Sequence, residues 1–455
     1  MKYSYGLFIC LLVLCLVTTI ACNKGNQDVS EDRPDDKSPR NSLDFTDNSA
    51  IVFDEAGTLE ERYKAAKEGA IITLKPGKYN LDQTLVIDRD VTIRGEVLGK
   101  VIINSSAYST FVIPFGSPKF ENLTIVSTSE EKESRVFSIT GGTPKLQRCV
   151  ITTHHGSGVH VSQKETAPEI TDCTIKECGN NGIVVEKYAY GKFLNCNIYG
   201  NQSDGIVVKN NANPVFTNCK IHEGKGAGIE VSQRGCGVFT ECDIYGHTKM
   251  EIIIPSYATP LFQKCKIHDG VFGIGVLQMS LGTFEECDIY GHLLAGVAAY
   301  LGGMPILKKC KIRDGMGVGV LIGNAGLGNF SHCDIFGNVN GVYILDSGNP
   351  FLGKCQIHDQ KKCGILAEKQ ANARIVDCDI YRNTEAGIHI TDSSKLHVFA
   401  CKIHDEKNVG IFIGKQGQGR FEGNTLENNP TDWDIRDDAG EITGSGNTPE
   451  LPKRE

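Results

Sequence analysis

The chain has 455 residues, of which 40% are apolar, and its formal net charge is −8. An acidic balance of this size argues against nucleic acid and anionic membrane surfaces as partners. The 18 cysteines would suggest a disulfide framework. Twelve of them, however, fall in one repeated sequence frame, which removes them from that count.

Residues 1–22 have the pattern of a secretion leader. They carry one charge, and their apolar run, residues 7–20, is shorter than a membrane span. The run ends in Thr19-Ile-Ala-Cys22, which resembles a bacterial lipobox, although Thr19 stands where Leu is usual. The resemblance implies lipidation of Cys22 and an extracytoplasmic protein anchored to a bacterial membrane. Asn23 favours the outer membrane, and ordinary secretion and an uncleaved anchor are the alternatives.

Residues 23–45 are polar and charged, which predicts a disordered tether. Residues 46–140 should hold an N-terminal cap and the first coils. Within them, Thr58-Leu-Glu-Glu61 is a capping box that predicts a short helix to about Lys67. Such a helix would cover the open end of a solenoid core. Strands are expected at 71–74, 85–87, 91–93, 101–103 and 123–125, with a turn at 75–79.

One phrase recurs from Cys149 onward: an apolar residue, two variable residues, Cys, a variable residue and Ile. Successive copies are 22–24 residues apart, which is the signature of a repeat architecture. Asn424 takes the Cys slot in a final copy. The cysteines of this frame are Cys149, Cys173, Cys196, Cys219, Cys242, Cys265, Cys287, Cys310, Cys333, Cys355, Cys378 and Cys401.

Each copy also contains Gly-(Ile/Val)-x-(Ile/Val/Ala), usually nine residues after the Cys, as in Gly205-Ile-Val-Val208. Both phrases alternate as strands do, and no run within a copy has helical periodicity. A copy of ~23 residues built of short strands and turns predicts the coil of a parallel β-helix, with coils stacked about 4.8 Å apart. Regular coils should occupy residues 141–430. A C-terminal cap with Trp433 and a tail that is loose from about Gly440 should follow in residues 431–455.

The Cys slot of this frame should face inward and stack on its own copies from coil to coil. Cys then acts as a small apolar filler, and Asn424 fits because Asn ladders occupy such slots in related folds. A metal site would cluster its ligands instead of placing them in a row, so neither a metal nor another cofactor is expected. The cysteines outside the frame are Cys10, Cys15 and Cys22 in the leader, and Cys178, Cys236 and Cys363.

Longer stretches carry a resemblance to a known family. They are Pro260-Leu-Phe-Gln-Lys-Cys-Lys-Ile-His-Asp-Gly270 and Gly328-Asn-Phe-Ser-His-Cys-Asp-Ile-Phe-Gly-Asn338. With the capping helix and Pro76-Gly-Lys-Tyr79, they resemble pectin-lyase-like proteins with CASH-type repeats, and in particular the β-helix domain of a large eukaryotic F-box protein. The resemblance covers about residues 140–430. It implies an all-β, right-handed parallel β-helix and a carbohydrate-directed function. The Asp-Pro-His and paired-Asp motifs of the family's catalytic members are not found in the repeats.

Outward side chains near the Cys slot form a second pattern. Directly after the Cys, Lys and Asp alternate from coil to coil, which predicts attraction between stacked coils. Three residues after the Cys, aromatic rings alternate with His or Arg, and an acidic residue follows in alternate coils. One interpretation is an aromatic stack at a turn, with Asp bonding turn amides. The other is a patch for sugars or uronic acids, because Arg pairs with carboxylates. The candidate ligand-binding residues are Tyr245, His247, His268, Asp269, Tyr290, His292, Arg313 and Asp314.

The third residue of the Gly phrase should also point outward, and it is mostly apolar. An exposed apolar strip of this length marks a partner surface, unless a loop covers it. The candidate partner-surface residues are Ile253, Leu321, Tyr343, Leu366 and Phe412.

Two classes of function follow from these patterns. The first is a membrane-anchored binding scaffold for a glycan or a protein. The second is an enzyme that acts on uronate-containing polysaccharide, as a lyase, epimerase or hydrolase. Asp269 and Asp314 lie two coils apart, about 9.6 Å, near the separation used by inverting glycosidases. The regular repeats and the absence of long inserted loops favour binding.

The leader generates a testable prediction. Cys22→Ser should abolish lipidation and release the protein from membranes, because the thiol is the group that would carry the lipid. Membrane fractionation of cells that express either form measures this. A variant that sediments with membranes like the wild type would contradict the lipoprotein interpretation.

Overall fold

The structure is a computed structural model, and it describes residues 57–452. These residues lie in one compact unit, Ala50–Glu455. Cys22, the leader and the predicted tether lie outside the described residues. No helix in the described part of the chain is long and apolar enough to cross a membrane.

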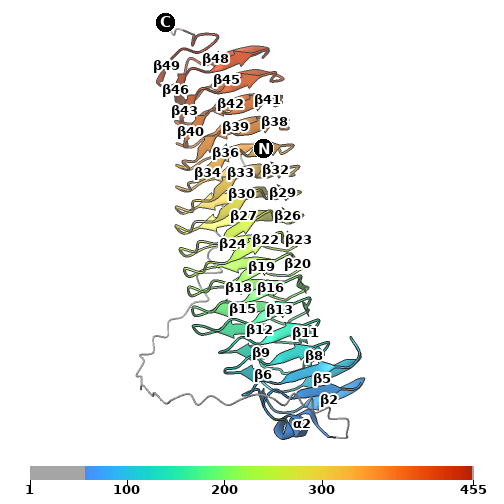
Figure 1. Ribbon diagram of the computed structural model, residues 1–455. Coiled ribbons are helices and arrows are strands. Elements are labelled where there is room, and N and C mark those ends of the chain that lie inside the picture. The colour runs from blue at the N-terminus through green and yellow to red at the C-terminus, as the bar shows by residue number, and fades with distance from the viewer. Residues whose placement is uncertain (1–56, 453–455) are drawn as a thin grey trace, which may run out of the picture. The chain divides into compact units, whose positions relative to one another are not determined.

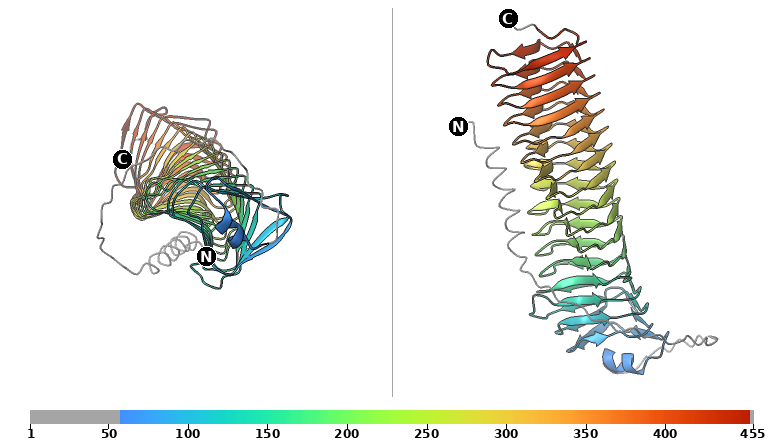
Figure 2. Two further views of the ribbon diagram at one scale, coloured as in Figure 1. Left: turned by 60° about the horizontal axis from the view of Figure 1, so that its bottom comes forward. Right: turned by 90° about the vertical axis from the view of Figure 1, so that its left-hand side faces the viewer.

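Three parallel β-sheets and one short helix make up residues 57–452, and the strands wind into a right-handed solenoid of about 16 turns. Each complete turn contributes one strand to each sheet in the order A, B, C. Figure 1 shows the turns stacked from helix α2 to strand β49. The end-on view in Figure 2 shows successive turns lying over one another. The predicted all-β, right-handed parallel β-helix is confirmed.

Sheet A has 17 strands. They are β1 (Ile71–Leu74), β4 (Thr92–Gly95), β7 (Lys119–Glu121), β10 (Lys145–Gln147), β13 (Glu169–Thr171), β16 (Lys192–Leu194), β19 (Val215–Thr217), β22 (Val238–Thr240), β25 (Leu261–Gln263), β28 (Thr283–Glu285), β31 (Ile306–Lys308), β34 (Asn329–Ser331), β37 (Phe351–Gly353), β40 (Asn372–Val376), β43 (Lys395–Phe399), β46 (Gln418–Glu422) and β49 (Ile442–Ser445).

Sheet B has 16 strands. They are β2 (Gly77–Leu81), β5 (Val101–Ser105), β8 (Thr124–Ser127), β11 (Val150–Thr153), β14 (Thr174–Lys176), β17 (Asn197–Tyr199), β20 (Lys220–His222), β23 (Asp243–Tyr245), β26 (Lys266–His268), β29 (Asp288–Tyr290), β32 (Lys311–Arg313), β35 (Asp334–Phe336), β38 (Gln356–His358), β41 (Asp379–Tyr381), β44 (Lys402–His404) and β47 (Thr425–Glu427).

Sheet C also has 16 strands. They are β3 (Leu85–Val86), β6 (Ser109–Ile113), β9 (Arg135–Ile139), β12 (Ser157–Ser162), β15 (Ile183–Glu186), β18 (Ile206–Val208), β21 (Ile229–Val231), β24 (Met250–Ile254), β27 (Phe272–Leu277), β30 (Ala295–Tyr300), β33 (Val318–Ile322), β36 (Val342–Ile344), β39 (Cys363–Ala367), β42 (Ala386–Ile390), β45 (Val409–Ile413) and β48 (Thr431–Ile435).

The pairing register places each residue on its own copy in the next coil. Phe216 pairs with Phe239, which pairs with Phe262. Their rings stack in the core with centroids 5.0 and 4.6 Å apart. A parallel sheet that is paired in this way buries its inner face continuously, which explains why the core runs through the whole stack.

The cysteines of the repeated frame are free and buried in this core. Their thiols contact backbone carbonyls, as in Cys196, whose Sγ lies 3.4 Å from the Ile170 oxygen. The predicted Asn ladder is confirmed at Asn424, whose Oδ1 accepts a hydrogen bond from Cys401 N at 2.9 Å and whose Nδ2 donates to Val398 O at 3.1 Å. Cys therefore fills space, whereas Asn in the same slot satisfies backbone groups.

The N-terminal end is covered by helix α2 (Leu59–Ala65), as Figure 1 shows. The predicted capping box is present, because Thr58 Oγ1 accepts from Glu61 N and Glu61 Oε2 accepts from Thr58 N. The predicted turn at 75–79 is wrong in part, since Gly77–Leu81 form β2. Three-strand coils therefore begin at β1, well before the Cys frame.

The C-terminal end differs from the expectation of a loose tail after Gly440. Ile442–Ser445 form β49 and pair with β46. Asn447 occupies a further copy of the Cys slot, where its Oδ1 accepts from Asn424 N at 3.1 Å. Trp433 packs edge-on against Phe421 at a centroid distance of 5.3 Å. The solenoid thus continues one coil further than the cysteines indicate.

Burial of the thiols predicts their chemical behaviour. Cys178 and Cys363 are as buried as the frame cysteines, and burial raises the pKa of each of these thiols to about 12. The thiolate is the reactive species. A maleimide reagent should therefore label native protein rapidly at Cys236, which is partly exposed, and slowly at the other described cysteines. Mass spectrometry of labelled peptides before and after denaturation measures this, and fast native labelling of the frame cysteines would contradict the core assignment.

Candidate functional site

Six of the eight candidate ligand-binding residues lie together on the outer face of sheet B. Four of them, Tyr245, His268, Tyr290 and Arg313, stand in adjacent coils. The Tyr245 and His268 rings stack at 4.9 Å, and those of His268 and Tyr290 at 4.6 Å. The Arg313 guanidinium lies 4.4 Å above the Tyr290 ring. Every ring inside this stack is therefore covered on both faces.

Covered ring faces change the expected role of this patch. A sugar packs on an aromatic ring through the open face of the ring. Tyr245 is covered by His222 and His268, and Tyr290 is covered by His268 and Arg313. Only ring edges point to solvent, so the stack supports the structural interpretation of these residues.

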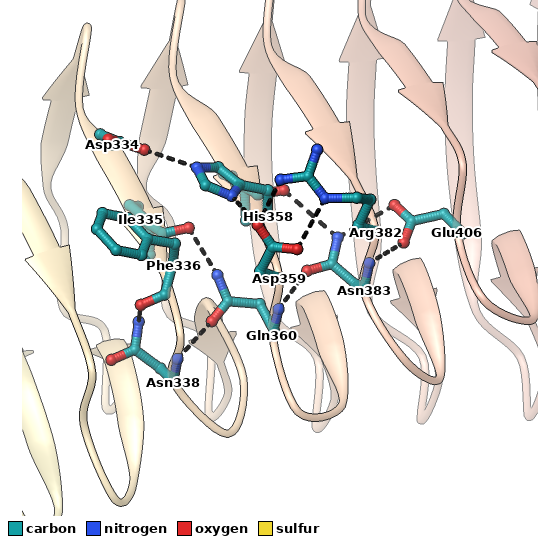
Figure 3. A network of polar contacts seen from close by, with 11 residues as sticks. Asp334, Ile335, Phe336, Asn338, His358, Asp359, Gln360, Arg382, Asn383 and Glu406 are labelled. Carbon is teal, nitrogen blue, oxygen red and sulfur yellow. Dashed lines mark hydrogen bonds and ion pairs between the residues drawn. The ribbon is translucent and has the colours of Figure 1, made fainter.

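Carboxylates bracket the His and Arg members of the stack. His268 Nε2 lies 3.0 Å from Asp243 Oδ1 in the preceding coil, and its Nδ1 lies 2.8 Å from Asp269 Oδ2. His404 lies in the same way between Asp379 and Asp405. His358 lies between Asp334 and Asp359, as Figure 3 shows. Attraction was predicted between the stacked Lys and Asp, but Asp243 contacts the imidazole of His268, two residues past Lys266.

Arg313 has its hydrogen-bonding groups engaged in the same way. Nε and Nη2 donate to the two oxygens of Asp288 at 3.0 and 2.9 Å, and Nη1 donates to Asp314 at 2.8 Å. The bonds to Asp288 raise the pKa of Arg313. A ligand carboxylate would have to displace a bidentate partner, which is the strongest form of this interaction.

The other two candidates, His247 and His292, do not belong to the patch. They are 3% and 1% exposed. His247 Nδ1 lies 2.5 Å from Glu251 Oε2, and His292 Nε2 donates to Ile267 O at 3.1 Å. Burial lowers the pKa of His292. The sequence pattern placed them outside because it assumed strand alternation through the turn. The preceding residue, Gly246 or Gly291, has a positive φ of 73°, which turns the next side chain inward.

This inward slot, five residues after the Cys, forms a buried polar ladder that the sequence analysis missed. Asn338 Nδ2 donates to Ile312 O at 3.2 Å, and Gln360 Nε2 donates to Ile335 O at 2.6 Å. Each side-chain oxygen accepts a backbone N–H from the coil before it, and Figure 3 shows these bonds to Gln360 and Asn383. The signal in the sequence is the run of small or polar residues in this slot: Cys178, Asn201, Gly224, His247, Gly270, His292, Gly315, Asn338, Gln360, Asn383, Glu406 and Asn429.

Glu406 is the acidic residue among the twelve in this slot. Its two oxygens accept from Asn383 N at 2.5 Å and from Asn383 Nδ2 at 3.1 Å. A carboxylate has no hydrogen to donate, whereas the neighbouring amides donate to an Ile carbonyl. Burial raises the pKa of Glu406 to about 8, and the charges of Asp405 and Asp359 add to this. Burial thus favours the neutral acid in this slot, against the two bonds from Asn383, which favour the carboxylate.

The predicted partner strip is not an exposed surface at most of its positions. Ile253, Leu321 and Tyr343 are 4%, 1% and 8% exposed. Leu366 and Phe412 are half-buried and pack against a small outer cluster of Cys363, Ala386 and Val409. A partner surface made of these five residues stays a prediction. Most of the strip is too buried to support it.

Residues 57–452 contain no group of three or more His, Cys, Asp or Glu side chains arranged to hold a metal ion. Their main surface hollows lie away from the sheet B stack. One is at the C-terminal end around Ile442 and Leu451, and the other follows the turns from Asp346 to Asp438.

Comparison with protein families identifies the fold. The family model "Right handed beta helix region" matches residues 101–248, 231–350 and 324–448. The chain belongs to the right handed beta helix family. Among curated proteins, this family member is similar to the F-box protein dre-1 of Caenorhabditis elegans, with 30% identity over 161 residues. The match covers 30% of this chain and 17% of that protein, so it spans a small part of the relative.

Solved structures of polysaccharide-active proteins are also similar to this β-helix. The catalytic domain of a GH87 alpha-1,3-glucanase in complex with tetrasaccharides has 11% identity and a TM-score of 0.39, with 88% of this chain and 68% of that one covered. Pectate lyase Pel9A has 11% identity and a TM-score of 0.33, with 60% and 70% covered. The Azotobacter vinelandii mannuronan C-5 epimerase AlgE6 A-module has 14% identity and a TM-score of 0.29, with 85% and 92% covered.

The buried carboxyl gives a prediction on stability. The pKa of Glu406 in the folded chain, about 8, lies above the usual unfolded value of ~4.3. Its contribution to the free energy of unfolding is fully present below the unfolded pKa and is lost as pH rises from about 4 through 8. Thermal melts measure this. Between pH 5 and pH 8.5 the free energy of unfolding should fall further for wild type than for Glu406→Gln, by on the order of a few kcal/mol.

The control is Glu385→Gln, an exposed carboxyl in the preceding coil. It should melt with the same pH dependence as the wild type. Identical pH dependence of Glu406→Gln and wild type would show that Glu406 is ionised in its slot.

Proposed function

We propose that this protein is a non-catalytic, extracytoplasmic scaffold that binds a glycan. A lipid on Cys22 would anchor it to a bacterial membrane. The observation that supports it is the closed charge pairing of the sheet B stack. Asp243 and Asp269 are engaged by His268, and Asp288 and Asp314 by Arg313. A general acid or base has to reach the substrate and exchange a proton with it. Groups that are paired in each coil on an open face are poorly placed for this.

The architecture suits an extended ligand. Parallel coils at a constant spacing present the same slots again and again along a rigid body, and solenoids use such surfaces to bind long partners. The family resemblance to carbohydrate-directed β-helices supports a glycan as that ligand. An enzyme acting on polyuronates is the outcome that would contradict this proposal.

Two assays of the purified full chain separate these outcomes. Incubation with polygalacturonate and alginate should give neither unsaturated products nor reducing ends. Affinity electrophoresis through gels that contain a panel of acidic and neutral polysaccharides should show retarded migration with at least one of them. Asp269→Asn and Asp314→Asn should leave that retardation unchanged. Turnover by the wild type that is lost in either variant would overturn the proposal.

A further inference from the structure

A second set of aromatic side chains lies in the turns that join sheet C to sheet A. Tyr188, Tyr190, Tyr257, Met279 and Leu301 are 57%, 48%, 59%, 64% and 36% exposed. Arg234 is exposed in the same series of turns. We call these six residues the ridge. None of them belongs to the eight candidates from the sequence.

The ridge is a continuous structure because its turns are bonded to one another. Tyr188 N donates to Asn210 O at 3.0 Å, and Arg234 N donates to Ser256 O at 3.1 Å. Met279 N donates to Leu301 O at 3.2 Å. The side chains are therefore held at fixed intervals, with Tyr188 and Tyr257 three coils or about 14 Å apart.

The backbone of the ridge does not call for bulky residues. Tyr188, Tyr257 and Met279 have φ values of 62°, 63° and 57°. This left-handed region favours Gly and Asn, and a large side chain there is an outlier. Asn211 occupies the same slot one coil after Tyr188, with φ 61°. The same slot has a positive φ in later coils, as at Ala325, Ser347 and Gln416, so the turn accepts small residues and does not itself require a ring.

The rings of the ridge are open where those of sheet B are closed. In the described part of the chain, Tyr188, Tyr190 and Tyr257 stack on no other ring and lie under no guanidinium, unlike Tyr245 and Tyr290. With about half of each residue exposed, these rings can contact a flat apolar surface, such as the face of a sugar ring.

Charge narrows the class of ligand. Six successive turns, 187–191, 209–214, 232–237, 255–260, 278–282 and 301–305, contain Lys187, Lys209 and Arg234 but no Asp or Glu. The chain as a whole has a net charge of −8. The later turns of the same series alternate Asp346, Lys369, Asp392, Lys415 and Asp438. Lys209 is paired with Glu186 at 3.2 Å, so Lys187 and Arg234 carry the local positive charge that complements an anionic ligand.

We propose that the ridge binds an acidic glycan, with Tyr188, Tyr190 and Tyr257 packed against sugar rings and Arg234 paired with a sugar carboxylate. This inference rests on the proposed glycan-binding function and assigns its site and ligand class. A protein partner fits less well, because the core of a protein interface is apolar and well packed, whereas Asn211 and Arg234 separate the tyrosines here.

The decisive variants replace Tyr188 and Tyr257 by Asn, singly and together. Affinity electrophoresis of the purified full chain measures binding to polygalacturonate and alginate. The Kd should rise at least about tenfold in the double variant. The melting temperature should stay the same or rise, because Asn211 shows that Asn suits this backbone. Arg234→Gln should weaken binding to these acidic polymers but not to neutral hydroxyethylcellulose.

Two controls make the outcomes distinguishable. Gln416→Asn changes the same slot outside the ridge and should leave binding unchanged. Arg313→Ala should lower the melting temperature and leave binding unchanged, because Arg313 holds Asp288 and Asp314 in the sheet B stack. Wild-type binding that survives the double variant, or is lost in Arg313→Ala, would overturn the ridge and leave the proposed function intact.

Two further results bear on the ligand itself. A wild-type chain that binds none of the acidic and neutral polymers would overturn the proposed function, and the ridge assignment with it. Equal retardation by polygalacturonate and hydroxyethylcellulose, each reduced in the double variant, would keep the ridge as a glycan site but overturn the acidic class.

Discussion

Each coil lies in register on the next, so the nearest neighbours of a side chain are the residues about one repeat before and after it. This single constraint governs the core, the charges and the surface. In the core it stacks Phe on Phe and Cys on Cys, where packing needs only that the slot keep its volume. At polar slots it demands complementarity, because identical charges stacked at about 4.8 Å would repel each other. The alternation of Asp and His along sheet B meets that demand.

The same constraint explains how much could be predicted from the sequence. Slots on strands, such as Cys196, Ile267 and Asn424, follow a period of two, so their inward direction was predictable from spacing. His247 and His292 follow a residue with positive φ, where the period of two ends. The pairing of Asp243 with His268 instead of Lys266 depends on side-chain reach, which a repeat pattern does not encode. The exposure of the ridge could not be predicted from the sequence, since Tyr and Met side chains such as Tyr188 and Met279 also occur in protein cores.

Two aromatic arrays on one solenoid thus have opposite properties. The array on sheet B is closed, with ring faces covered by neighbours and charges paired, and this is the pattern of a structure that holds itself in register. The ridge is open, and small residues in the same slot of later coils, such as Ala325 and Ser347, show that simpler residues would serve the backbone. Hydrogen bonds between its turns keep the spacing of the ridge without a ligand, which lowers the entropy lost on binding.

The alternation along sheet B also limits how such a chain can change its length. A coil with Asp243 and Tyr245 is followed by one with Lys266 and His268, then by one with Asp288 and Tyr290. Loss or duplication of one coil would set His against His and Lys against Lys. Loss or duplication of two coils would restore every pairing. In these coils, the unit that preserves the pairing is therefore a pair of coils.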